Sequence, residues 1–170
     1  MSYQLKDKEY NYIINNIINN KDFLKIDSCR HHGITRLEHS LRVSYYSYKV
    51  SKFLKLDARQ TARAGLLHDF FIDEQLNKKE KRLSAFYHPK KAVDNADTMF
   101  ILTDKEKDII YSHMFPLIPN HVPKYMESWV VSIVDKCVAS YEFATSYSKT
   151  FLFKIQNALF ILAFVAGKGF

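Results

Sequence analysis

The segment ARAGLLHDF, residues 62–70, decides the interpretation of this chain, because an apolar helix pattern ends there in two ionisable residues. The pattern predicts a helix from Ala58 to about Phe71. His68 and Asp69 follow its apolar run directly, where a buried charge would need a hydrogen-bonded cation or a metal. Taken alone, a histidine or an aspartate at such a place is more often a helix cap or a satisfied core group.

A second acidic residue stands in an apolar helix pattern further along the chain. Asp135 lies in VVSIVDKCVAS, residues 130–140, and shares a helical face with Val131 and Val138. His39 lies in an earlier helix pattern, RLEHSLRVSYYS, residues 36–47. Imidazole and carboxylate groups are the ligands that a catalytic divalent metal takes, and helices of a bundle can point them at one ion. We therefore expect a metal site that involves His39, His68, Asp69 and Asp135.

Two further histidines lie between Asp69 and Asp135 in the sequence. His88 precedes a proline at an expected helix start, and His113 ends another expected helix. Hydrolytic sites with two metals hold the ions roughly 3.5–4 Å apart, so these histidines could bind a second ion near the first.

The ordered set of His39, His68-Asp69 and Asp135, with the strings quoted above, resembles the HD superfamily of metal-dependent phosphohydrolases. The segments YHPKKAVDNA (87–96) and DIIYSHMFPL (108–117) resemble the two extra-histidine segments of its binuclear subgroup. Among characterised groups, the chain resembles the bacterial HD-domain diadenosine tetraphosphatases, which are binuclear. The hydrolase of the stringent-response alarmone has an acidic pair after its HD, and the offset position of Asp73 and Glu74 here disfavours that interpretation.

The resemblance implies a role for each matching residue. His39, His68, Asp69 and Asp135 match the ligands of the first metal, and His88 and His113 match those of the second, the ions being Fe, Mn, Co, Ni or Mg. Asp69 would bridge the ions and position the attacking water. Three residues would contact a phosphorylated substrate: Arg36, Lys136 and His32. Arg36 and Lys136 could instead be surface residues of their helices.

The implied function is hydrolysis of a small phosphorylated molecule, a nucleotide or a dinucleoside polyphosphate, by water that the metals activate. Two alternatives remain open at this stage. HD-type di-iron oxygenases share the ligand order and differ in redox chemistry. A non-catalytic module that binds a nucleotide would keep the fold without turnover.

The rest of the chain predicts one all-α domain over residues 1–170, a bundle of about six to eight helices. Three pairs, Thr35 with Glu38, Asp57 with Gln60 and Thr103 with Glu106, have the spacing that begins a helix. The expected helices cover residues 8–20, 35–54, 58–71, 89–99, 104–113, 125–147 and 151–165, with a loop or short exposed helix over 73–86. The HD core would span about residues 32–144, with the helices 8–20 and 151–165 packed on it.

Net charge, cysteine content and apolar segments say less about the binding partner than the histidine and aspartate motifs do. The net charge of +7 suits an anionic partner, but the basic residues are scattered and no nucleic-acid motif accompanies them, so no specific nucleic-acid partner is expected. Two cysteines make no disulfide framework. No signal-peptide core and no apolar run of about 18 residues is present, which favours a cytoplasmic protein without a transmembrane segment. The apolar segment 151–165 could close the bundle, form a homodimer contact or touch a membrane surface.

Overall fold

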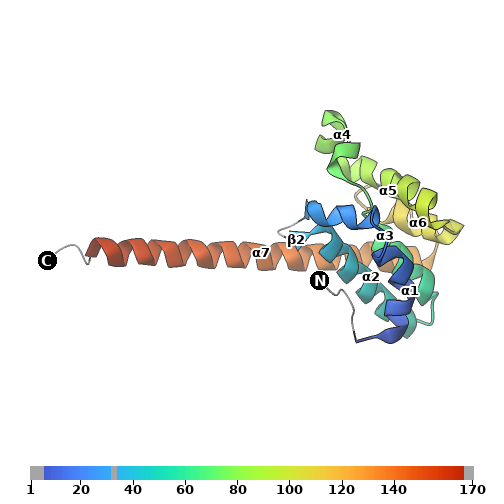
Figure 1. Ribbon diagram of the computed structural model, residues 1–170, viewed down its shortest axis with the longest axis horizontal. Helices are drawn as coiled ribbons and strands as arrows, with labels where there is room; N and C mark the ends of the chain where they lie inside the picture. The colour runs from blue at the N-terminus through green and yellow to red at the C-terminus, as the bar shows by residue number, and fades with distance from the viewer. Residues whose placement is uncertain (1–5, 32–33, 167–170) are drawn as a thin grey trace.

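The chain folds into helices that gather around the short helix preceding His68 (Figure 1). The computed structural model describes residues 6–31 and 34–166, with side chains for residues 6–29 and 34–146. Within these residues seven α-helices confirm the predicted all-α fold. Their bounds are α1 (Lys8–Ile18), α2 (Arg36–Phe53), α3 (Ala58–Leu67), α4 (Lys78–Arg82), α5 (Ser84–Phe100), α6 (Asp104–Ser112) and α7 (Met126–Ala166). Two 3-10 helices, η1 (Phe23–Ser28) and η2 (Asp73–Gln75), lie between them.

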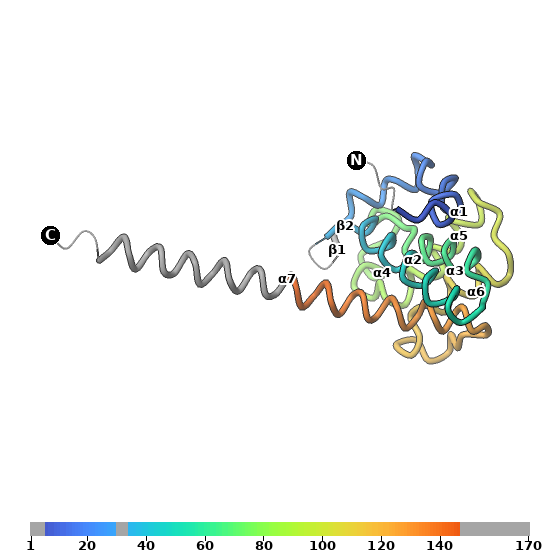
Figure 2. The backbone as a smooth tube through the Cα atoms, turned by 90° about the horizontal axis from the view of Figure 1, so that it is seen from below, coloured from blue at the N-terminus to red at the C-terminus, as the bar shows by residue number. Residues whose placement is uncertain are grey.

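Helix α3 is central to the bundle. It packs against α2 most extensively, and α1, α5, α6 and α7 also contact it. Figure 2 shows the bundle from below, with α7 running along one side. Because α3 ends at Leu67, this arrangement places His68 and Asp69 where several other helices meet.

The three predicted helix starts are present. Thr35 and Thr103 accept hydrogen bonds from the backbone N–H groups of Glu38 and Glu106, which complete capping boxes for α2 and α6. Asp57 accepts a hydrogen bond from the backbone of Gln60 at the start of α3. Each such cap contributes about 1 kcal/mol to helix stability, and together they fix where the ligand-bearing helices begin.

Helices α2 and α3 approach each other closely because α2 turns small residues towards its neighbours. Ser40, Ser44, Ser47 and Ser51 are all fully buried. A Cβ added at Gly65 would lie 3.2 Å from the Cα of Ser44, so a larger residue at position 65 would push the helices apart. The close approach brings the end of α3 next to the middle of α2.

An apolar cluster lies at the end of the bundle where α1 packs. Tyr10, Ile14, Ile17 and Phe23 are at most 2% exposed. The Tyr10 hydroxyl donates to Ser44 Oγ at 2.9 Å. Burial of apolar surface holds this end together, at about 25 cal/mol for each Å² removed from water.

Two predicted helix bounds are wrong at the ends nearest the ligands. Helix α3 ends at Leu67 rather than near Phe71, because His68 caps it and its ring bonds back to the Gly65 carbonyl. Helix α5 begins at Ser84, not at Pro89, so Pro89 lies inside the helix. The His88 ring bonds to the carbonyl of Ser84 and holds the turn that precedes the proline.

The two helices expected at 125–147 and 151–165 are one helix, α7. The expected break between residues 147 and 151 is wrong, because this stretch contains neither glycine nor proline to interrupt the helix. The predictions that 151–165 packs on the bundle or forms a homodimer concern side chains outside those the structure describes. No helix among the described residues is long and apolar enough to cross a membrane.

A two-stranded hairpin was not predicted. Strands β1 (Arg30–His31) and β2 (Ile34–Thr35) pair antiparallel just before α2. Strands of two residues are too short to show the alternation by which a strand is recognised.

Candidate metal centre

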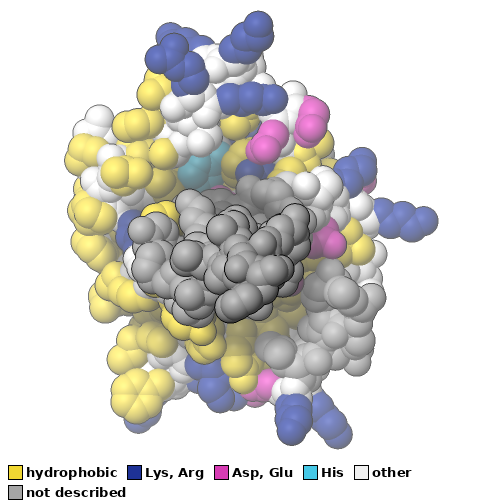
Figure 3. Space-filling model, turned by 90° about the vertical axis from the view of Figure 1, so that its left-hand side faces the viewer, with side chains coloured by type: hydrophobic (Ala, Val, Ile, Leu, Met, Phe, Trp, Pro, Cys, Tyr) yellow, Lys and Arg dark blue, Asp and Glu magenta, His cyan; other side chains and the backbone are white. Residues whose placement is uncertain are grey.

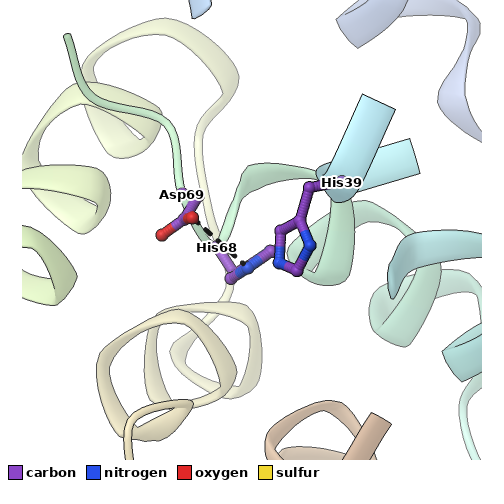
Figure 4. Close-up of side chains that lie close together, drawn as sticks. All are labelled: His39, His68 and Asp69. Atoms are coloured by element: carbon purple, nitrogen blue, oxygen red, sulfur yellow. Dashed lines mark ion pairs between the residues drawn. The ribbon is translucent and has the colours of Figure 1, made fainter. Parts of the chain in front are cut away.

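Four histidines and two aspartates from five parts of the chain meet at one side of the bundle. His39 comes from α2, His88 from α5 and Asp135 from α7. His68 and His113 occupy the cap positions that end α3 and α6, and Asp69 follows His68. Every one of the six is buried. Figure 4 shows His39, His68 and Asp69 turned towards one another.

Three of the rings are oriented by backbone carbonyls. The Nδ1 atoms of His68, His88 and His113 lie 2.8, 2.8 and 2.6 Å from the carbonyl oxygens of residues 65, 84 and 110, respectively. A carbonyl oxygen only accepts, so each Nδ1 carries the proton and donates it. In the neutral ring each Nε2 is then an unprotonated nitrogen with its lone pair directed into the site, which is the form that binds metals.

His88, His113 and Asp69 form one group of potential ligands. The two Nε2 atoms are 2.9 Å apart, and that of His88 is 3.2 Å from Asp69 Oδ1. Two lone pairs at this distance repel unless a positive charge lies between them. A proton is not available near neutral pH, because burial lowers the pKa of both histidines, and that of His113 to about 3. A cation therefore suits this group better than a hydrogen bond.

His39, His68 and Asp135 form the second group. Asp135 Oδ1 lies 3.0 Å from His39 Nε2 and 3.6 Å from His68 Nε2. The Nε2 atom of His68 is buried and has no hydrogen-bond partner within reach. Such an orphaned buried nitrogen is costly in a protein and is expected where a ligand completes the site.

Charge in this second group is balanced by protonation of His39. Burial alone would lower the pKa of His39, but hydrogen bonds to Asp135 and Glu142 raise it to about 10. Burial would likewise raise the pKa of Asp135, yet the hydrogen bond with His39 and the nearby ring of His68 hold it well below its usual range. The site thus collects negative charge that a divalent cation would neutralise in place of the proton.

The donor set fits a divalent metal. Bonds of about 2.1 Å to nitrogen or oxygen put neighbouring ligand atoms roughly 3.0–3.4 Å apart. The nearest contacts between candidate ligand atoms here are of similar length, from 2.9 Å between the Nε2 atoms of His88 and His113 to 3.8 Å between His68 Nε2 and Asp69 Oδ2. Three sets of ligand atoms lie close enough together to hold an ion: His39 with His68 and Asp69, His68 with His113 and Asp135, and Asp69 with His88 and His113.

Comparison with known families agrees with this geometry. The family model described as the HD domain matches residues 36–140, which is more than half of the 170 residues and includes all six ligands. The chain belongs to the HD domain family. Most members of that family are metal-dependent hydrolases. No curated protein and no solved structure matches the chain, so the narrower resemblance to diadenosine tetraphosphatases is not confirmed.

Four of the six candidate ligands, Asp69, His88, His113 and Asp135, line a cleft of about 600 Å³ in this HD domain. Figure 3 shows a histidine surface between hydrophobic side chains, with lysine and arginine side chains gathered above it, towards α4. The cleft is lined by Arg36, Asp69, Phe71, Ser84, Ala85, His88, His113, Met114, Pro116, Leu117, Asp135, Lys136 and Ala139. The rest of its lining is largely apolar, with Phe71, Met114, Pro116 and Leu117 among the lining residues.

The three predicted substrate residues have different positions. Arg36 lines the cleft, but its guanidinium already donates to the Phe71 carbonyl at 2.7 Å and to Asp73 at 2.9 Å, and it stacks on the Phe71 ring. Lys136 also lines the cleft and donates to the carbonyl of His113 at 2.6 Å. His32 lies outside the described residues.

The sequence interpretation missed Glu142 and Phe71. Glu142 is 2% exposed and its carboxylate contacts His39 Nδ1 at 2.8 Å. Its spacing of seven residues from Asp135 places both on one helical face, and that spacing is the signal that could have found it. Phe71 stacks on the His88 ring, and nothing in its local sequence indicates that role.

Proposed function

We propose that this HD domain is a metal-dependent phosphohydrolase that acts on a small phosphorylated molecule, a nucleotide or a dinucleoside polyphosphate. One observation carries the proposal: six buried imidazole and carboxylate groups converge, and four of them, Asp69, His88, His113 and Asp135, line an open cleft. A structural metal site would be closed on all sides, whereas a catalytic site leaves positions for water and substrate.

The proposal includes two ions. Asp69 supports it, because its Oδ1 lies nearest to His88 and its Oδ2 faces His68. A carboxylate with one oxygen towards each group suits a bridge between metals roughly 3.5–4 Å apart. Iron, manganese, cobalt, nickel and magnesium are all compatible with a mixed nitrogen and oxygen donor set.

When bound, the metals would supply Lewis-acid chemistry by lowering the pKa of a coordinated water towards about 7 and by neutralising phosphate oxygens. Asp69 would orient that water. Lys136, whose Nζ lies 3.6 Å from Asp135 Oδ2, would face the transferring phosphoryl group. Arg36 would bind a further phosphate oxygen by releasing Asp73, whose side chain is 53% exposed.

The shape of the cleft favours a small substrate over a polymer. A volume of about 600 Å³ is in the range of small-molecule sites. The basic residues of α4, beside the start of α5, would raise the local concentration of an anion without forming a track for a nucleic-acid backbone.

Metal analysis followed by a substrate panel tests the proposal. We expect protein purified without chelator to contain a divalent metal, and a manganese-soaked crystal to show two anomalous peaks a few ångströms apart. With Mn, Fe, Co, Ni or Mg added, it should hydrolyse diadenosine tetraphosphate or mononucleotides at near-physiological salt. Asp69→Ala should lose both metal and turnover.

Each other outcome has a definite meaning. Full metal content and activity in Asp69→Ala would refute the site. Processive degradation of single-stranded oligonucleotides, with small nucleotides untouched, would refute the substrate class. Oxygen uptake by a reduced iron form without phosphoester turnover would favour an oxygenase, and tight nucleotide binding without turnover would favour a binding module.

A further inference from the structure

Glu142 is a buried carboxylate that the metal-binding set does not include. It lies on α7 and its two oxygens have different partners on α2. Oε2 lies 2.8 Å from His39 Nδ1, and Oε1 accepts a hydrogen bond from Arg42 Nη1 at 2.9 Å. Its side chain is fully enclosed, while that of Arg42 is 41% exposed.

His39 therefore differs from the other three histidines of the site. Their Nδ1 atoms donate to backbone carbonyls, whereas that of His39 meets a charged acceptor. A carboxylate behind a ligand histidine fixes the ring orientation and makes the opposite nitrogen a stronger donor to metal. The opposite nitrogen here is His39 Nε2, which faces Asp135 Oδ1 at 3.0 Å.

A role in holding α2 and α7 together would not by itself explain why Glu142 is buried with one oxygen on His39 and the other on Arg42. Enclosing a carboxylate costs several kcal/mol, and an ion pair with a partly exposed arginine returns little of that cost. The second oxygen of Glu142 contacts the ring of His39, a candidate ligand, so the rest of its charge is compensated through the metal-binding group. The enclosed charge thus serves the metal-binding group more directly than it serves helix packing.

We propose that Glu142 is a positioning residue that orients His39 for metal binding and strengthens its Nε2 as a ligand, with Arg42 holding the carboxylate in place. The proposal rests on the metal centre and not on the phosphohydrolase activity. Its tests therefore measure metal binding, which can succeed or fail whatever the substrate is.

The experiment compares four variants of the full chain: Glu142→Ala, Glu142→Gln, Arg42→Gln and Glu127→Gln. Glu127 is the matched control, because it is a buried glutamate on the same helix. Its Oε1 accepts hydrogen bonds from Lys105 and from the backbone of Asp57, both outside the metal-binding set. The affinity of the metal-free proteins for Mn²⁺ and Zn²⁺ is measured by competition with a chromophoric chelator.

We expect Glu142→Ala to weaken metal binding about 10–100-fold, the usual effect of removing such a partner. Glu142→Gln should fall between Ala and wild type, because an amide oxygen still accepts from Nδ1 but carries no charge. Arg42→Gln should lose less than Glu142→Ala, and Glu127→Gln should stay within about twofold of wild type.

A second measurement separates positioning from stability. Nitrogen-15 NMR of the imidazole of His39 should show one tautomer, protonated at Nδ1, in zinc-loaded wild type, and a changed Nδ1 signal in Glu142→Gln. Wild-type affinity in folded Glu142→Gln and Arg42→Gln would overturn the proposal, even if Glu142→Ala does not fold. Equal weakening in Glu127→Gln would also overturn it, because the effect would then follow helix stability alone.

Discussion

The two sides of the bundle are built on opposite principles. Where α1 packs, Tyr10, Ile14, Ile17 and Phe23 leave almost no surface in water and have few polar groups to satisfy. At the metal centre an equally buried region holds six ionisable side chains, including a histidine nitrogen without a hydrogen-bond partner. Helix α2 belongs to both, because Tyr10 binds its Ser44 and the ligand group includes its His39.

The difference teaches which region carries stability and which carries chemistry. Apolar burial stabilises the fold whatever is bound, whereas clustered imidazoles and carboxylates destabilise it until a cation joins them. The apolar side should thus tolerate no truncation but have no influence on metal binding. Substitutions at the metal centre should instead change metal binding strongly and leave the stability of the metal-free fold unchanged or higher.

The largest expected effect comes from making the metal side apolar. His113→Phe removes a ligand and should weaken metal binding by more than about 100-fold, beyond the usual effect of losing an outer partner. The metal-free variant should melt at the same temperature as wild type or higher, because a phenylalanine ring removes the close approach of two unprotonated nitrogens, which offsets the lost hydrogen bond to the Ile110 carbonyl. Calorimetry with and without metal tests both parts. A clear loss of stability in the metal-free variant would contradict the comparison.

Truncating the apolar side should give the opposite result. Ile14→Ala leaves a cavity in the apolar core where α1 packs and should lower the free energy of unfolding by about 3 kcal/mol. Its metal affinity, measured where the variant is folded, should remain within about twofold of wild type. Urea unfolding and chelator competition provide the two numbers, and a joint loss of stability and affinity would show that the two sides are not separate.

The smallest effect is the pH dependence of the metal-free protein. The unfolded chain has His88 and His113 near a pKa of 6.5, whereas burial lowers both values in the fold, that of His113 to about 3. Stability from these groups is complete above pH 6.5 and is lost as pH falls towards 3, because the unfolded state binds protons first. The slope should reach about 1.4 kcal/mol per pH unit for His113. His113→Phe should reduce it, and an unchanged slope in thermal melts would argue against a neutral, buried His113.

The helix starts and the candidate ligands could be predicted from the sequence, because each depends on the type and spacing of a few residues. The caps at Thr35, Asp57 and Thr103 have fixed spacings to their partners, and they begin helices in the structure where predicted. His68, Asp69 and Asp135 are candidate ligands because an ionisable residue in an apolar helix pattern needs a compensating partner. His39, His88 and His113 are candidates through their positions in the chain and the family resemblance. Their joint presence at one centre agrees with that prediction, while their roles in binding and catalysis stay predictions.

Other features depend on tertiary contacts that no local pattern contains. The end of α3 is decided by a ring that bonds to Gly65, and the start of α5 by a ring that bonds to Ser84. The serines of α2 are buried because α3 approaches at a glycine, although their polarity suggests a surface. Arg36 holds the loop after the HD pair, a contact that spans 35 residues in sequence.

Three residues of α7 contact three different parts of the protein: the start of α3, the candidate ligand group and His39 on α2. Glu127 accepts a hydrogen bond from the backbone N–H of Asp57, and Asp135 and Glu142 contact the two ring nitrogens of His39. Intervals of eight and seven residues set these contacts about 12 and 10 Å apart along the helix. Each inserted or deleted residue between them would shift the later positions by about 1.5 Å and rotate them by about 100°. Substitutions on the exposed face of this stretch can therefore accumulate freely, but its length cannot change.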